Sequence, residues 1–211
     1  MPKLPKFDIL GQAHFATTKT NRFLPLFLTH DMCKILINNI AFYRSKHDFR
    51  LLGYVIMPDH IHLLIYPQAK VPIQKILQDI KRYSAKQILE RLLENPTSWD
   101  ELGGLVIPPE RLKMDNRAET RRCLQNVHVT TFTDFQVIKP RTKGQEHQIW
   151  QESFYDFNIY SDAKLHEKLN YMHKNPLAWN LVEDPGIYYY SSYRNYYDEG
   201  GGDLPIQIDY L

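Results

Sequence analysis

Four short apolar or aromatic runs, each bounded by turn-forming residues, predict β-strands. They lie at residues 13–18, 50–56, 59–66 and 150–160. Only a Met-Pro pair separates the second run from the third, so we expect these two strands to be neighbours joined by a tight connection. Successive side chains of a strand point to opposite faces of the sheet, so each run also predicts which residues share a face.

Three longer segments carry apolar residues at helical spacing and predict α-helices. They lie at residues 29–45, 72–94 and 161–175, and they begin with residues that are favoured at helix starts, Thr29, Pro72 and Ser161. Pro176 follows the third segment directly. Because a proline pushes the preceding residue out of the helical region, we predict that this helix ends near Asn175.

The predicted elements follow one another as strand, helix, strand, strand, helix, a long segment without periodicity, strand and helix. An antiparallel sheet backed by helices in this order predicts an α+β sandwich of the ferredoxin-like or RNA-recognition-motif type. A chain of 211 residues with 43% hydrophobic content suits a single domain over residues 1–211. Residues 96–148 are interpreted as an insertion before the last strand, with a short helix at 115–125 and a hairpin strand at 130–138.

The composition argues against a membrane protein and against a secreted protein. No apolar run approaches the about 20 residues that a membrane-spanning helix needs, and the N-terminal residues lack the apolar core of a signal peptide. The cysteines, Cys33 and Cys123, show no CxxC spacing. We therefore expect a cytoplasmic protein that does not contact a membrane. The net charge of +2 is too small to indicate a nucleic-acid partner by itself.

The sequence His60-Ile61-His62 lies within the third predicted strand. Strand alternation places both imidazoles on one face and Ile61 on the other. A divalent metal bound between two such rings offsets the cost of placing them side by side. A pair of half-buried, hydrogen-bonded histidines is the alternative, and the motif alone leaves both interpretations open. No His-Glu-x-x-His sequence is present to indicate a zinc hydrolase.

A second candidate group lies on the last predicted helix, whose apolar stripe is formed by Leu165, Leu169 and Met172. Tyr171 and Asn175 fall outside this stripe and are four residues apart, so they lie one above the other on a flank of the helix. The simplest interpretation is a surface pair. Together with two histidines, however, the oxygen of Asn175 suits a hard cation such as Mg²⁺ or Mn²⁺, and Tyr171 then lies one turn away as a nucleophile.

Five sequence blocks occur together along the chain. They are MPDHIHLL at 57–64, Lys81, WQESFYD at 150–156, YMHKNP at 171–176 and SSY at 191–193. With these blocks the chain resembles the single-tyrosine HUH transposases, in particular the REP-associated tyrosine transposases, which have an IS200-like transposase domain. The resemblance extends over about residues 13–197, apart from the segment at 96–148.

This resemblance implies a ferredoxin-like sheet, a divalent metal (Mg²⁺ or Mn²⁺) and single-stranded DNA that folds into hairpins. His60, His62 and Asn175 are then the metal ligands, and Tyr171 is the nucleophile. The implied activity is that of an endonuclease and strand transferase in DNA transposition, which acts through a covalent 5′-phosphotyrosine intermediate.

Two other functions stay open at this point. One is a DNA-hairpin-binding protein of the same fold that no longer cuts, and the other is a metal-dependent hydrolase that uses water. Lys81, Arg82 and Lys174 are candidates for contacts to DNA phosphates, although long cations on helices are often merely solvated. The proposed site residues suit a monomer and a homodimer that exchanges helices equally well.

Overall fold

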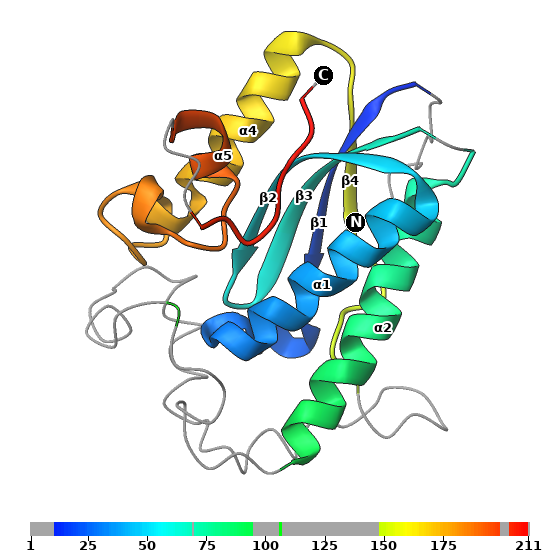
Figure 1. The fold of residues 1–211 in the computed structure, drawn as a ribbon, viewed down its shortest axis with the longest axis vertical. Helices are drawn as coiled ribbons and strands as arrows, with labels where there is room; N and C mark the ends of the chain where they lie inside the picture. Colours follow the sequence, from blue (N-terminus) through cyan, green and yellow to red (C-terminus); the bar gives the residue numbers. More distant parts are fainter. Residues whose placement is uncertain (1–10, 69, 95–105, 107–147, 199–202, 211) are drawn as a thin grey trace.

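A four-stranded antiparallel sheet in the order β2-β3-β1-β4 forms the centre of the fold (Figure 1). The computed structural model describes residues 11–68, 70–94, 106, 148–198 and 203–210. The strands are β1 (Ala13–Lys19), β2 (Phe49–Met57), β3 (His60–Pro67) and β4 (Tyr155–Ile159). This strand order, with one helix after β1 and another after β3, is that of the ferredoxin-like fold, and it confirms the predicted fold class.

The helices lie on both faces of the sheet. Those in the described part of the chain are α1 (His30–His47), α2 (Ile73–Leu93), α4 (Asp162–Ala178) and α5 (Tyr193–Tyr197), with short 3-10 turns η1 (Asn21–Phe23), η2 (Leu26–Leu28) and η6 (Pro185–Ile187). α1 and α2 run side by side on one face, and α4 packs against the other (Figure 1). None of the described helices is long and apolar enough to cross a membrane.

Each of the three long helices begins where the sequence predicted. Thr29, Pro72 and Ser161 occupy the N-cap positions of α1, α2 and α4. The Ser161 hydroxyl accepts a hydrogen bond from the Lys164 backbone N–H at 3.3 Å, and this satisfies a donor that the first helical turn leaves without a helical partner.

The last strand is shorter than predicted, because β4 covers Tyr155–Ile159 rather than 150–160. Trp150 forms only an isolated bridge with Thr20, and its indole Nε1–H donates to the Ser84 hydroxyl of α2 at 3.1 Å. The Trp150 side chain therefore packs beneath α2, and Trp150 is not part of a strand. The predicted helix at 115–125 and strand at 130–138 lie outside the described residues, as does nearly all of the insertion predicted at 96–148.

α4 continues through Pro176 to Ala178, so the predicted end near Asn175 is wrong. Proline lacks an N–H group and removes one helical hydrogen bond. Backbone N–H groups beyond it hold the turn, since Trp179 donates to the Asn175 carbonyl and Leu181 to that of Pro176, both at 2.9 Å. Burial of Pro176 has overridden the local bias against a helical residue before proline. Asn175 is only 5% exposed, which corrects its predicted place outside the core.

The C-terminal part of the chain covers the outer edge of β2. Backbone hydrogen bonds run from Ser192 N–H to the Tyr54 carbonyl, from Ile56 N–H to the Tyr190 carbonyl and from Asp209 N–H to the Leu51 carbonyl. An uncovered edge strand offers its backbone groups to other chains. These bonds satisfy that edge from within the same molecule.

The close approach of α4 to β2 depends on Gly53. A Cβ atom at this position would lie 2.8 Å from Met172 Cε and 2.9 Å from Leu169 Cδ2, and both residues belong to α4. Such distances are shorter than packed carbon atoms allow, so any larger residue must move the helix or its side chains. Gly53 therefore leaves the space that the Met172 and Leu169 side chains occupy between α4 and β2.

Replacing Gly53 with valine should lower the free energy of unfolding by about 1–3 kcal/mol, because the branched side chain overpacks the contact with Met172 and Leu169. Chemical denaturation measures this change. Gly53→Ala adds a single carbon and should destabilise the protein less. Equal stability of wild type and Gly53→Val would show that the packing of α4 does not depend on this contact.

Candidate active site

His60 and His62 lie on β3 and share one face of the sheet, as strand alternation predicted. Their ring centroids are 4.8 Å apart, and both side chains are buried. Both lie on the inner strand β3, between β2 and β1, and little of either side chain is exposed. Their polar atoms must therefore find partners inside the protein.

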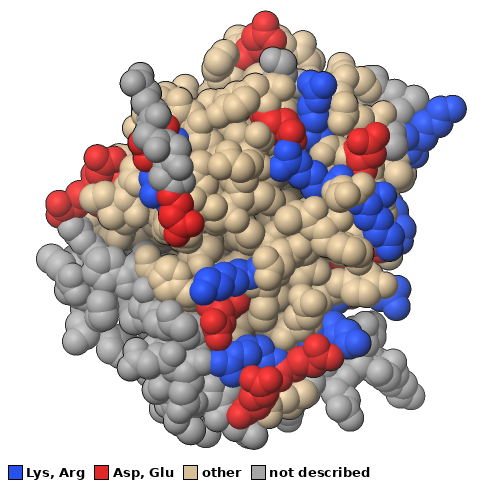
Figure 2. Space-filling view, in the orientation of Figure 1, with Lys and Arg blue, Asp and Glu red and all other residues tan. Residues whose placement is uncertain are grey.

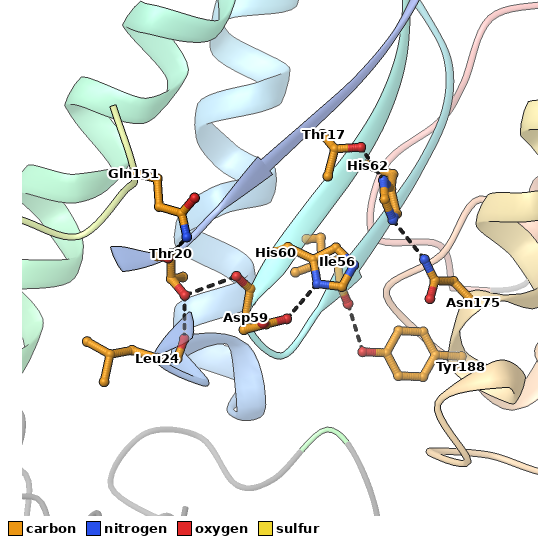
Figure 3. Close-up of polar contacts among 10 residues, drawn as sticks. All are labelled: Thr17, Thr20, Leu24, Ile56, Asp59, His60, His62, Gln151, Asn175 and Tyr188. Atoms are coloured by element: carbon orange, nitrogen blue, oxygen red, sulfur yellow. Dashed lines mark hydrogen bonds and ion pairs between the residues drawn. The ribbon is translucent and has the colours of Figure 1, made fainter. Parts of the chain in front are cut away.

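His62 is hydrogen-bonded through both ring nitrogens (Figure 3). The Asn175 amide Nδ2 lies 2.7 Å from Nε2, and Thr17 Oγ1 lies 2.7 Å from Nδ1. If the amide N–H donates to Nε2, then Nδ1 carries the proton and donates to the hydroxyl. The ring also stacks on Phe15 at 5.3 Å. These contacts connect α4 to β1 through one imidazole.

His60 is oriented by its neighbour in the sequence. Its Nδ1–H donates to the Asp59 carboxylate at 2.5 Å (Figure 3). The Asp59 carbonyl accepts from the Thr20 backbone N–H at 2.8 Å and from the Thr20 hydroxyl at 3.0 Å. Thr20 in turn accepts a hydrogen bond from the Gln151 side chain through its own carbonyl at 3.1 Å. Thr20 and Gln151, which are distant in the sequence, thus fix the turn that carries Asp59 and His60.

Tyr171 lies beside the histidines on the same side of the sheet. Its ring is 5.4 Å from that of His62 and 6.0 Å from that of Phe15, in both cases edge to face. The side chain is 53% exposed, so solvent or a ligand can reach it. The structure therefore brings Tyr171, Asn175, His60 and His62 together within a single chain.

Burial holds His62 in its neutral form. It lowers the pKa of the imidazole well below its usual value, and the positive charges of His60, Lys19 and Lys168 lower this pKa further. A neutral imidazole keeps a lone pair, which can accept a hydrogen bond or bind a metal. Asn175 Nδ2 faces this lone pair in the structure.

The donor atoms fit a small open metal site. Nδ1 of His60 is hydrogen-bonded to the Asp59 carboxylate, and Nδ1 of His62 is hydrogen-bonded to Thr17 Oγ1. A metal-bound imidazole usually has such a hydrogen bond at its other ring nitrogen. Turning over the Asn175 amide would present its oxygen where the nitrogen now lies. Among the described residues, no group of three or more His, Cys, Asp or Glu side chains is placed to hold a metal ion. A metal here would therefore depend on Asn175 and on oxygen atoms of a substrate or of water.

Of the cations that the sequence suggested for DNA binding, Lys81 and Arg82 lie on α2, whereas Lys174 lies on α4, three residues after Tyr171. The Lys81 ammonium donates to the carbonyls of Gln151 at 2.5 Å and Glu152 at 3.2 Å, so it supports the chain before β4. Arg82 is exposed on α2, and Lys174 is exposed on α4. On the face that Figure 2 shows, lysine and arginine side chains are interspersed with acidic ones and form no continuous basic area.

Local sequence patterns do not predict several residues of the site. Asp59 directly precedes His60, and this proximity was a usable signal for a hydrogen-bonded pair. Thr17, Thr20 and Gln151 gave no such signal, because their roles depend on strand register and on contacts between distant segments.

Part of the chain is similar to a known protein family. Residues 11–102 match the family model described as "Transposase IS200 like". This part of the chain is similar to the IS200-like transposases. The IS200-like segment contains β1, α1, β2, β3 and α2, and with them the two histidines, whereas Tyr171 and Asn175 lie beyond it. The search of curated proteins found no match.

The fold is similar to that of a solved REP-associated tyrosine transposase. A solved structure described as a REP-associated tyrosine transposase bound to a REP hairpin covers 99% of this chain and 93% of its own, with a TM-score of 0.58 and 14% sequence identity. A putative transposase from Deinococcus radiodurans R1 covers 82% and 97%, with a TM-score of 0.41 and 12% identity. The first similarity extends the shared fold beyond the IS200-like segment to α4.

We expect His62 to stay neutral, with its proton on Nδ1, when the pH falls through the range in which an exposed histidine titrates, near 6.5. Long-range ¹H–¹⁵N NMR on the metal-free protein measures both the tautomer and the pKa. Because the unfolded state takes up this proton first, His62 should contribute stability above about pH 6.5 that is lost as the pH falls towards the folded pKa. Protonation of folded His62 near pH 6.5 would contradict this assignment.

Proposed function

We propose that this protein is a metal-dependent single-stranded DNA endonuclease and strand transferase, an HUH-type tyrosine transposase that acts on hairpin-forming DNA. The observation that carries the proposal is the placement of an exposed phenol, that of Tyr171, 5.4 Å from the ring of a buried, neutral His62. The IS200-like segment and the shared fold of a transposase bound to a hairpin support the same substrate class.

In the proposed reaction, the Tyr171 oxygen attacks the phosphorus atom of the scissile phosphate. The bond from phosphorus to the 3′ oxygen breaks, and that oxygen leaves as a 3′-hydroxyl after it gains a proton. The phenol loses its own proton, and the 5′ phosphate becomes covalently joined to Tyr171. Attack by a second 3′-hydroxyl reverses these steps and rejoins the strands, so cleavage and ligation need no separate energy source.

His60, His62 and Asn175 would hold the divalent metal, Mg²⁺ or Mn²⁺. When bound, such a cation draws negative charge from the scissile phosphate. Asp59 and Thr17 orient the two imidazoles, and burial keeps His62 in the unprotonated form that a ligand requires. Because one chain supplies all of these groups, we infer that a monomer can complete the site.

Incubating the protein with Mn²⁺ and single strands that form hairpins should yield a covalent protein–DNA adduct on a denaturing gel. Tyr171→Phe should abolish the adduct and retain hairpin binding, because only the nucleophilic oxygen is lost. Tyr155→Phe is the matched control, since Tyr155 is also exposed on this face, with its ring 6.4 Å from that of Phe15.

Each alternative outcome of this experiment has a distinct meaning. If the adduct persists in Tyr171→Phe and disappears in Tyr155→Phe, the nucleophile is Tyr155 and not Tyr171. Cut strands without attached protein would indicate a hydrolase that uses water. Hairpin binding without an adduct under any metal condition would indicate a binding protein that no longer cuts.

Thr17→Val should weaken Mn²⁺ binding by about 10- to 100-fold, because it removes the hydroxyl that orients His62 and changes the side-chain shape little. Calorimetric titration of the metal-free protein measures the affinity. Thr18→Val is the matched control, since Thr18 is buried on the opposite face of β1 and its hydroxyl makes no hydrogen bond within the described residues. Equal affinity of Thr17→Val and wild type would remove Thr17 from the metal site.

A further inference from the structure

Lys168 of α4 is held over two aromatic rings. Its Nζ lies 4.8 Å from the centre of the Phe157 ring and 5.4 Å from that of Phe15. Phe15 and Phe157 face each other across β1 and β4, and we call this pair the aromatic shelf. The Lys168 side chain is only 19% exposed, so its stem covers the shelf while cation–π attraction holds its amine.

The aromatic shelf places this amine at the candidate site. The Phe15 ring stacks on His62 at 5.3 Å and meets the Tyr171 ring edge to face at 6.0 Å. Lys168 precedes Tyr171 by three residues, so both side chains project from the same flank of α4. Its charge also contributes to the lowered pKa of His62.

The ion pair of Lys168 with Glu167 does not account for a positive charge at this position. Glu167 Oε1 lies 3.5 Å from Nζ, but the Glu167 side chain is half exposed and also pairs with Lys164. Exposed pairs of this kind contribute little to stability. A fixed cation near His60 and His62 would repel a divalent metal unless an anion lay between them. An anionic ligand in the site explains the arrangement.

We propose that Lys168 binds the phosphate of the single DNA strand at the candidate site, with its ammonium donating to a non-bridging phosphate oxygen. This inference rests on the proposed function, because it assigns to Lys168 the phosphate that Tyr171 attacks. A lysine recognises phosphate as a point charge, so the contact strengthens binding without selecting a sequence.

The test measures how the affinity for a hairpin-bearing single strand depends on salt concentration. Fluorescence anisotropy reports the binding, and all variants carry Tyr171→Phe so that no cutting occurs. Lys168→Met keeps an apolar stem on the shelf and removes the charge. It should reduce the slope of log binding constant against log salt concentration by about 0.7, the value for one phosphate contact on a single strand. Lys168→Arg should keep the wild-type slope, because it keeps the charge.

Lys86→Met is the matched control for this measurement. Lys86 is exposed on α2, on the opposite face of the sheet, and pairs with Glu90 at 3.7 Å. The substitution removes the same charge and should leave the slope unchanged. A slope that falls equally in Lys86→Met and Lys168→Met would reflect net charge alone and would overturn the proposal, as would an unchanged slope in Lys168→Met.

A second measurement on the wild-type side chain does not depend on the folding of a variant. Acetylation followed by mass spectrometry should show Lys168 reacting several-fold more slowly when the strand is bound, while Lys86 reacts equally with and without DNA. Equal reactivity of Lys168 in the two conditions would overturn the proposal.

Adduct formation by the wild-type protein separates this inference from the proposed function. An adduct together with an unchanged salt slope in Lys168→Met refutes the phosphate contact alone. Protection of Lys168 by DNA without any adduct supports the contact and refutes the strand transferase.

Discussion

The two hydrogen bonds of His62 tie α4 to the sheet, and the candidate site depends on them. Thr17 binds one ring nitrogen and Asn175 the other, so one imidazole joins β1 to α4 through the inner strand β3. Because these groups are buried, the loss of one partner leaves another polar group unsatisfied, at a cost of roughly 1–3 kcal/mol. Gly53 leaves room at β2 for the Met172 and Leu169 side chains of the same helix.

Charge imposes the second constraint on the site. Burial keeps His62 neutral, while the Lys168 amine remains nearby over the aromatic shelf. The neutral imidazole of His62 and the amide of Asn175 offer donor atoms to a cation, while the ammonium of Lys168 offers a partner to an anion. A metal–phosphate pair meets both requirements, which connects the electrostatics to the proposed reaction at a DNA backbone.

Local patterns in the sequence predicted most of the fold, because strands and helices are selected by short-range periodicity and by capping residues. They placed β1, β2, β3, α1 and α2 close to their observed bounds, and they put His60 and His62 on one face. The same reasoning failed where tertiary contacts override local preference. The local pattern predicts a helix end before Pro176, but α4 passes through it. It also predicts that Trp150 is part of a strand, but its indole bonds Ser84 of α2.

The sequence by itself determined the elements, the sheet faces and the chemical groups available to the site, since each of these follows from spacing within a single element. Only the tertiary structure decided which groups meet. His62 is 45 residues from Thr17 and 113 from Asn175, so neither contact leaves a periodic signal in the chain. Burial of Asn175 and placement of Lys168 on the aromatic shelf arise from the packing of α4 on the sheet, which brings together side chains that no local pattern relates.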